Sequence, residues 1–133
     1  MSNIYGKCSK GKATRLHSLL VRSRGECEAH TAHRAGAIDW HPQCSGGLEC
    51  SHIISRSYAW TRTDLDNALC LCSGAHFHVG TFQKHHLELV AHVYGAGHWD
   101  VLYRRANEGV NRKFDWDDRA ETLLALSITR GLA

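Results

Sequence analysis

The stretch that decides the fold is 67–78, which reads NALCLCSGAHFH. The run ALCLC at 68–72 is short and apolar and is followed by Ser73-Gly74, a pattern that predicts a buried strand. Cysteine and histidine side chains, which are preferred zinc ligands, lie at the end of this strand and just beyond it. The stretch therefore indicates one half of a metal site, and other parts of the chain must supply the other half.

Composition places the chain among globular proteins. It has 133 residues, enough for one domain, with 43% hydrophobic and 22% charged residues. No apolar run reaches the roughly 18 residues of a membrane span, and the N-terminal segment lacks the apolar core of a signal peptide, so we expect a cytoplasmic protein with no membrane partner. In a reducing compartment, six cysteines and eleven histidines favour metal binding over disulfides. The net charge of +3 is weak support for a nucleic-acid partner.

The elements around this stretch can be predicted from periodicity. Leucines at helical spacing predict a short helix over 12–25 that ends at Gly25, and an irregular segment over 30–47 predicts a long loop. The segment 48–57 suits a strand that runs into a turn, and 61–67 has polar turn chemistry. Three helices are expected afterwards: 77–94, 98–110 and 115–131, the last with Asp115 as N-cap.

The predicted fold is therefore α+β and mainly helical, with a small hairpin in the middle of the chain. We expect a single domain over 1–133, with a finger core at about 27–80 and a C-terminal helical extension at about 81–133. In that arrangement His52 lies on the first strand, Asn67 at the turn into the second, and His76 where the next helix begins. Two strands that feed a helix would bring these three side chains together, with His52 suited to proton removal and His76 to a cation. Asn67 can either ligate the cation or pin the loop that carries His52.

Three segments in this order resemble the HNH, or ββα-metal, endonuclease superfamily, and in particular its zinc-supported phage and prophage members. They are CSHIISR at 50–56, TRTDLDN at 61–67 and LCSGAH at 71–76. The resemblance implies a ββα-metal finger in which His52 is the general base, His76 ligates the catalytic cation and Asn67 holds the middle position. It also implies one divalent catalytic ion, magnesium or manganese, with nickel or zinc as alternatives. Ser51 departs from the family, whose members often have a metal ligand immediately before the base.

The resemblance also implies a structural zinc site, with a second departure. The family knuckle Cys-x-x-Cys-His reads Cys72-Ser-Gly-Ala75-His76 here, so one cysteine ligand is missing. Cys27 and Cys44 correspond best to the other knuckle. Cys70 lies two residues before Cys72 on the same side of a strand and is the expected fourth ligand. His78 is the alternative to Cys70, and on the other knuckle two histidines are rivals at knuckle spacing: His30, three residues after Cys27, and His41, three residues before Cys44.

We therefore expect a metal-dependent endonuclease that hydrolyses DNA phosphodiester bonds and, if phage encoded, works in the host cytoplasm. Arg56 and Arg62 flank the expected site and are candidate phosphate contacts. Cys50 is expected to point away from His52, and the helical His86 is expected to be exposed. Two alternatives stay open: a zinc-stabilised DNA-binding module without catalysis, and an accessory component of a phage packaging or recombination machine.

Overall fold

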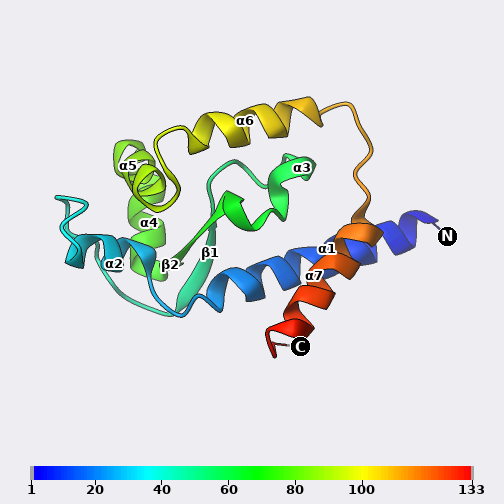
Figure 1. Cartoon of the computed structure of the whole chain (residues 1–133), viewed down its shortest axis with the longest axis horizontal. Helices are drawn as coiled ribbons and strands as arrows, with labels where there is room; N and C mark the ends of the chain where they lie inside the picture. Colours follow the sequence, from blue (N-terminus) through cyan, green and yellow to red (C-terminus); the bar gives the residue numbers. More distant parts are fainter. Residues whose placement is uncertain (1, 133) are drawn as a thin grey trace.

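The computed structural model describes residues 2–132 and the side chains of residues 9–132. Within that part, a two-stranded antiparallel hairpin lies at the centre and helices surround it (Figure 1). The elements are, in chain order, α1 (Ser2–Arg22), α2 (Glu28–Arg34), β1 (Leu48–His52), α3 (Ala59–Arg62), the 3-10 helix η1 (Leu65–Asn67), β2 (Ala68–Cys72), α4 (Ser73–Thr81), α5 (Gln83–Tyr94), α6 (His98–Glu108) and α7 (Trp116–Thr129). The predicted class, a mainly helical α+β fold with a hairpin followed by a helix, is confirmed.

The strand β2 is buried along its whole length, which explains its unbroken apolar sequence. Its pairing with β1 sets Leu48 opposite Cys72 and His52 opposite Ala68. Leu69 and Leu71 are fully buried in the main core, and burial of each such side chain contributes about 2 kcal/mol to the free energy of folding. The hairpin is therefore held from both faces.

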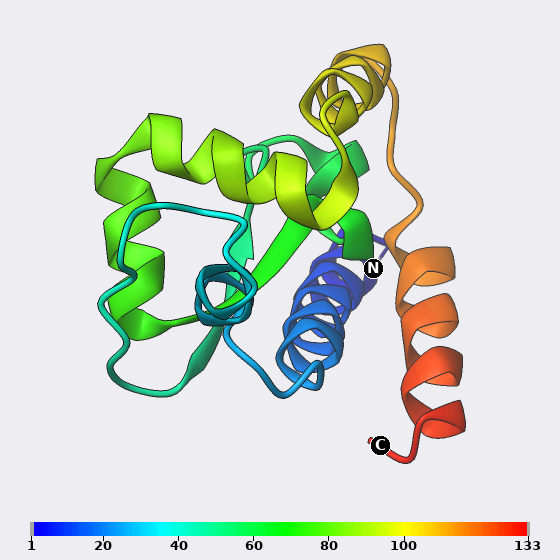
Figure 2. The same ribbon diagram turned by 60° about the vertical axis from the view of Figure 1, so that its left-hand side comes forward.

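The two faces of the hairpin meet different helices (Figure 2). On one face, Val21 of α1 packs against Ala68 and Cys70 of β2. On the other face, Leu69 and Leu71 join the main core, to which four helices contribute buried side chains. These are Ala29 and Ala32 of α2, Ala75 and Val79 of α4, Leu89 and Val90 of α5, and Leu102 and Ala106 of α6. Helix α1 thus covers the hairpin face opposite to α4.

The C-terminal helix α7 packs on α1 through a separate apolar cluster. Ala13 and Leu20 of α1 contact Ala120 and Leu123 of α7. Asp115 caps α7, as predicted, because its Oδ1 accepts a hydrogen bond from the N–H of Asp118 at 2.9 Å. Figure 1 shows α7 crossing α1, and the cluster adjoins the hairpin through Leu65, which packs against this cluster and against the β2 residues Ala68 and Cys70.

Carboxylates in the turn before β2 tie the last two helices to the hairpin. Asp64 accepts from Arg105 of α6 at 2.8 Å and from Arg119 of α7 at 2.7 Å. Asp66 also pairs with Arg105, at 2.8 Å. The turn chemistry predicted over 61–67 therefore has a second role, since its carboxylates also fix α6 and α7 to the centre of the fold.

Three sequence-based expectations about the elements are wrong. The helix predicted over 77–94 is two helices, because Phe82 adopts extended backbone angles (φ −113°, ψ 91°) and interrupts the series of helical hydrogen bonds. The loop predicted over 30–47 begins within helix α2, whose seven residues are too few to show an apolar period. His86 is only 8% exposed, because α5 turns it inward. No helix among the described residues is long and apolar enough to cross a membrane.

Candidate metal centres and catalytic site

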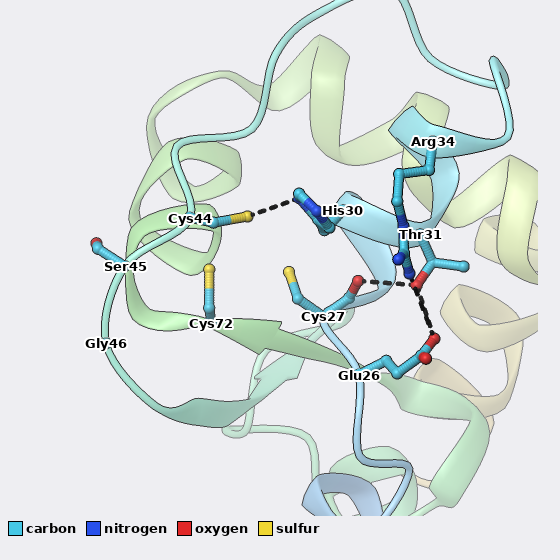
Figure 3. A pocket seen from close by; sticks show the side chains of 9 residues that line it. All are labelled: Glu26, Cys27, His30, Thr31, Arg34, Cys44, Ser45, Gly46 and Cys72. Carbon is cyan, nitrogen blue, oxygen red and sulfur yellow. Dashed lines mark hydrogen bonds and ion pairs between the residues drawn. The ribbon is translucent and has the colours of Figure 1, made fainter.

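Three cysteines from separate parts of the chain converge on one hollow. Cys27 precedes α2, Cys44 lies in the loop before β1, and Cys72 ends β2. Their sulfur atoms lie within 4.8 Å of one another, and they are free thiols. Figure 3 shows the three sulfurs pointing toward the same space, which has a volume of about 470 Å³. This spacing suits a single metal ion with tetrahedral sulfur ligands.

His30 supplies a fourth donor at the same place. It lies in the first turn of α2, three residues after Cys27, and its Nδ1 is 3.1 Å from the sulfur of Cys44 (Figure 3). Zinc bound by three cysteines and one histidine is a common structural arrangement. Cys27, His30, Cys44 and Cys72 therefore fit a structural zinc ion.

The protonation of these thiols also favours a cation. Burial, followed by the neighbouring sulfurs of Cys72 and Cys27, raises the pKa of Cys44 to about 11. Burial also acts to raise the pKa of Cys72, but N–H donors from the backbone of Ala75 and Ser45, with the other two thiols, outweigh it and lower that pKa. Three adjacent thiolates repel one another, and a divalent ion is the group that stabilises all three.

Cys70, the expected fourth ligand, is not part of this cluster. It is fully buried against Val21 of α1, on the face of β2 turned away from the metal cluster. The spacing argument fails because Cys72 is both the last strand residue and the N-cap of α4. Its sulfur accepts a hydrogen bond from the N–H of Ala75 at 3.4 Å, so its side chain leaves the strand alternation. The prediction for Cys70 is therefore wrong.

The other two histidine alternatives also lie elsewhere. The Nε2 of His78 is 2.8 Å from Nδ1 of His85, and both rings stack on Trp40. His41 is exposed and contacts the carbonyl oxygen of Pro42. His30 is thus the histidine that the structure brings to the cysteines.

Close backbone contacts hold the loop of Cys44 against the start of α4. The N–H of Gly74 donates to the carbonyl of Ser45 at 3.1 Å, and the N–H of Ser73 donates to that of Gly47 at 3.1 Å. A Cβ at Gly74 would overlap the carbonyl oxygen of Gln43, so only glycine allows this approach. Ala75, where the family knuckle has its second cysteine, is fully buried in the main core.

His52 ends β1 and has one nitrogen fixed by the backbone. Its Nε2 lies 2.8 Å from the carbonyl oxygen of Arg62. A carbonyl can only accept, so Nε2 carries the proton and Nδ1 keeps its lone pair. Burial, and then the charges of Arg56, Arg62 and His76, lower the pKa of His52. The imidazole is therefore neutral near pH 7, as a general base must be.

Asn67 holds the loop that follows His52, which is the second of the two roles predicted for it. It is fully buried, and its Oδ1 accepts from the N–H of Ile54 at 2.7 Å. Its Nδ2 donates to the carbonyl oxygens of Ile54 at 3.1 Å and Thr61 at 3.0 Å. Both polar atoms of the amide are thus engaged, so the assignment of Asn67 as a metal ligand is wrong: it closes the loop between His52 and β2.

His76 pairs with a carboxylate that sequence reasoning missed. Its Nδ1 lies 2.8 Å from Oε1 of Glu49 on β1, and both side chains are partly exposed. Hydrogen bonds from His76 and then Ser73 lower the pKa of Glu49. An imidazole beside a carboxylate is a suitable donor pair for a divalent cation. Because strand side chains alternate, Glu49 leaves β1 on the face opposite to His52. Proximity to His76 in the fold, not a motif, reveals this residue.

Both candidate phosphate contacts follow His52 in the chain: Arg56 lies in the loop after β1, and Arg62 ends α3. The charges of Arg56 and Arg62 both act on the pKa of His52, which places positive charge around the base. Arg56 is exposed. Arg62 is half-buried, and its guanidinium donates to Thr14 of α1 and to the carbonyl of Arg56. Arg56 is thus the freer of the two for a ligand.

A second group of metal-ligating side chains lies on the α1 side of the hairpin. One ligand atom from each of His17, Cys50 and His52 lies within 4.8 Å of the others. Cys50 shares a strand face with His52 because the two are two residues apart, so the expectation that it points away is wrong. The sulfur of Cys50 is 3.7 Å from Nδ1 of His17. The described residues thus contain two groups that could hold metal ions.

No protein family, curated protein or solved structure matches this chain.

Proposed function

We propose that the protein is an HNH-type endonuclease that hydrolyses DNA phosphodiester bonds with one divalent cation. The observation that carries this proposal is the anchoring of His52, whose Nε2 donates to the carbonyl of Arg62 while Nδ1 stays available for a proton. The order and spacing of His52, Asn67 and His76 add support through the resemblance to that superfamily.

In the proposed mechanism His52 takes a proton from the water that attacks phosphorus. Its lowered pKa keeps the ring neutral, and Asn67 holds the loop that carries the carbonyl of Arg62. Arg56 is placed to attract a phosphate by charge. Each of the three residues has its own role: His52 takes the proton from water, Asn67 positions His52, and Arg56 binds a phosphate of the nucleic-acid backbone.

The cation would be held by His76 together with Glu49, in place of Asn67. Although Glu49 leaves β1 on the face opposite to His52, the charge of His76 acts on His52, so the phosphate would lie between the His76–Glu49 pair and the base at the end of the strand. Both side chains are accessible, and an oxygen ligand suits magnesium or manganese. When bound, the ion supplies charge stabilisation for the phosphate and the departing 3′ oxygen. Ser51 is 2% exposed, in the main body of the fold, so it adds no accessible ligand.

A plasmid-nicking assay in a series of magnesium and manganese concentrations tests the proposal. We expect wild-type protein to nick supercoiled DNA, and His52→Ala to lose at least about 100-fold in rate, the contribution of a general base. His92→Ala is the matched control, because His92 is an exposed imidazole on α5. Equal nicking by wild type and His52→Ala would remove His52 from the reaction.

A zinc-stabilised DNA-binding module is the second candidate, and the burial of Ser51 favours it. That position is where the superfamily often has a cation ligand, and here it is closed to solvent. Such a module would retard plasmid DNA in a gel at every metal concentration without cutting it. Cutting that disappears with Glu49→Gln or His76→Ala, with retardation retained, would exclude the module.

A further inference from the structure

We propose that His17, Cys50 and His52 form a second metal site, which binds a zinc-like divalent ion on the α1 side of the hairpin. The group is separate from the cluster of Cys27, Cys44 and Cys72. The site joins a helix that packs on the hairpin, a thiol of strand β1 and the proposed general base.

The two imidazoles are oriented in the same way, which is the main support for this site. Nε2 of His17 lies 2.9 Å from the carbonyl oxygen of Asp64, and Nε2 of His52 lies 2.8 Å from that of Arg62. Each carbonyl accepts a hydrogen bond from the N–H at Nε2, so Nδ1 of both rings carries no proton and has a free lone pair. Histidine ligands of metals typically have their second nitrogen fixed by a backbone carbonyl or carboxylate in this manner.

The distances also fit a bound ion. Sulfur and nitrogen ligands at about 2.3 and 2.0 Å from a tetrahedral zinc lie roughly 3.6 Å apart. The sulfur of Cys50 and Nδ1 of His17 are 3.7 Å apart, and the rings of His17 and His52 have centroids 5.3 Å apart. Three N/S ligands leave the fourth tetrahedral position to water, and Cys50 and His52 are both partly open to solvent.

The chemistry of the three groups selects a soft ion rather than magnesium. The group offers two imidazole nitrogens and one thiol sulfur. Magnesium prefers oxygen ligands, whereas zinc and cobalt accept this set.

Occupation of this site has a consequence that rests on the proposed function. An ion held by Nδ1 of His52 uses the lone pair that would otherwise take a proton from water. Zinc would therefore inhibit cleavage that magnesium supports, and release of the ion would restore it. The same imidazole can serve as base or as ligand, but not as both at once.

Metal stoichiometry tests the site without reference to activity. We expect wild-type protein dialysed against micromolar zinc to retain two zinc ions per chain by elemental analysis, and Cys50→Ala to retain one. Cys70→Ala is the matched control, because Cys70 faces Cys50 across the hairpin and is not in the group, and it should retain two. His17→Gln, in which an amide can still donate to Asp64, is a second test and should also retain one.

Cobalt absorption gives an independent measurement. With the cysteine cluster filled by zinc, one further equivalent of cobalt should give a sulfur-to-cobalt charge-transfer band in wild type and Cys70→Ala, and none in Cys50→Ala. One zinc per wild-type chain, or an unchanged cobalt spectrum in Cys50→Ala, would overturn the site.

Inhibition of nicking by zinc is measured in a separate experiment. In magnesium, the zinc concentration that halves nicking should rise about tenfold or more in Cys50→Ala, since loss of a ligand weakens metal binding at least that much. Equal inhibition of both proteins would refute the block at His52. Two zinc ions on a protein that cuts no DNA would support the site while refuting the proposed function, so the two failures are distinguishable.

Discussion

Asn67 and Ile54 form a reciprocal pair of hydrogen bonds in which a side-chain amide takes the place of a neighbouring strand. Oδ1 of Asn67 accepts from the N–H of Ile54 at 2.7 Å, and Nδ2 donates to the carbonyl of the same residue at 3.1 Å. This pair extends the hairpin pairing by side-chain contacts beyond His52, where the backbone strand ends. The position of the proposed base thus depends on an amide that is fully buried and bonded to backbone groups.

Replacement of Asn67 should therefore act on stability. Asn67→Ala leaves the N–H and the carbonyl of Ile54 buried without the amide partner, and it removes one of the hydrogen bonds to the carbonyl of Thr61, which still accepts from the N–H of Asp64. We expect a loss of about 3 kcal/mol in the free energy of unfolding, measured by urea denaturation. Asn107→Ala is the control: its amide donates to Tyr103 on the exposed face of α6, and its loss should cost less than about 0.5 kcal/mol. A similarly small loss of stability for both substitutions would contradict the role of Asn67 in holding the loop.

The start of α4 offers a test of how the zinc loop is held. Gly74→Ala would drive a methyl group into the carbonyl of Gln43, next to Cys44. We expect overpacking to cost about 2 kcal/mol and the zinc affinity to fall about tenfold or more, measured by competition with a chelator.

Gly80→Ala in the same helix is the matched control. No heavy atom lies within 4 Å of a Cβ at Gly80, so alanine should raise stability by about 0.5–1 kcal/mol and leave zinc affinity unchanged. Retention of wild-type affinity in Gly74→Ala would show that the loop moves without disturbing the cysteines.

The hairpin could be predicted from sequence, whereas the details of the metal ligands could not. The segment 68–72 is apolar at every position, and a strand of that kind is recognised without knowledge of its neighbours. Which side chain joins the three cysteines depends on where the Cys72 side chain leaves the strand alternation, and the role of Cys72 as the N-cap of α4 sets that point. Helix α2, which carries His30, escapes prediction because its histidines and alanines show no apolar stripe.

The candidate catalytic residues also divide into predictable and unpredictable ones. Spacing alone suggests His52, Asn67 and His76, since turn and strand lengths fix such separations. Glu49 and His17 could not be predicted, because each reaches its partner through packing between elements distant in sequence. A carboxylate on a strand and a histidine inside an amphipathic helix are common, and neither has a distinctive motif.

The identity of the histidine zinc ligand can be tested by two substitutions. His30→Ala removes the nitrogen beside Cys44 and should lower zinc affinity by about 100-fold or more, with a fall in the melting temperature. His41→Ala should change neither quantity, because His41 is exposed, contacts the carbonyl of Pro42 and the ring of His33, and is not in the cysteine cluster. If His41→Ala lowered zinc affinity and His30→Ala did not, the fourth ligand would be His41 of the loop and not His30 of α2.

The dependence of stability on pH should reveal the buried His86 of α5. Burial, followed by the charge of His76, lowers the pKa of His86, whose Nε2 has no hydrogen-bond partner among the described residues. The unfolded chain takes up this proton near the ordinary pKa of about 6.5, before the folded protein does. Stability from the neutral ring is therefore complete above that pH and is lost as the pH falls toward the folded pKa.

We expect the free energy of unfolding of His86→Gln to fall less steeply than that of wild type between about pH 7 and 5, since glutamine does not titrate. His92→Gln is the control from the exposed side of the same helix and should keep the wild-type slope. Urea denaturation at a series of pH values in constant ionic strength gives the three slopes. If His92→Gln flattened the curve as much as His86→Gln, the effect would come from the net charge of α5 and not from the burial of one ring.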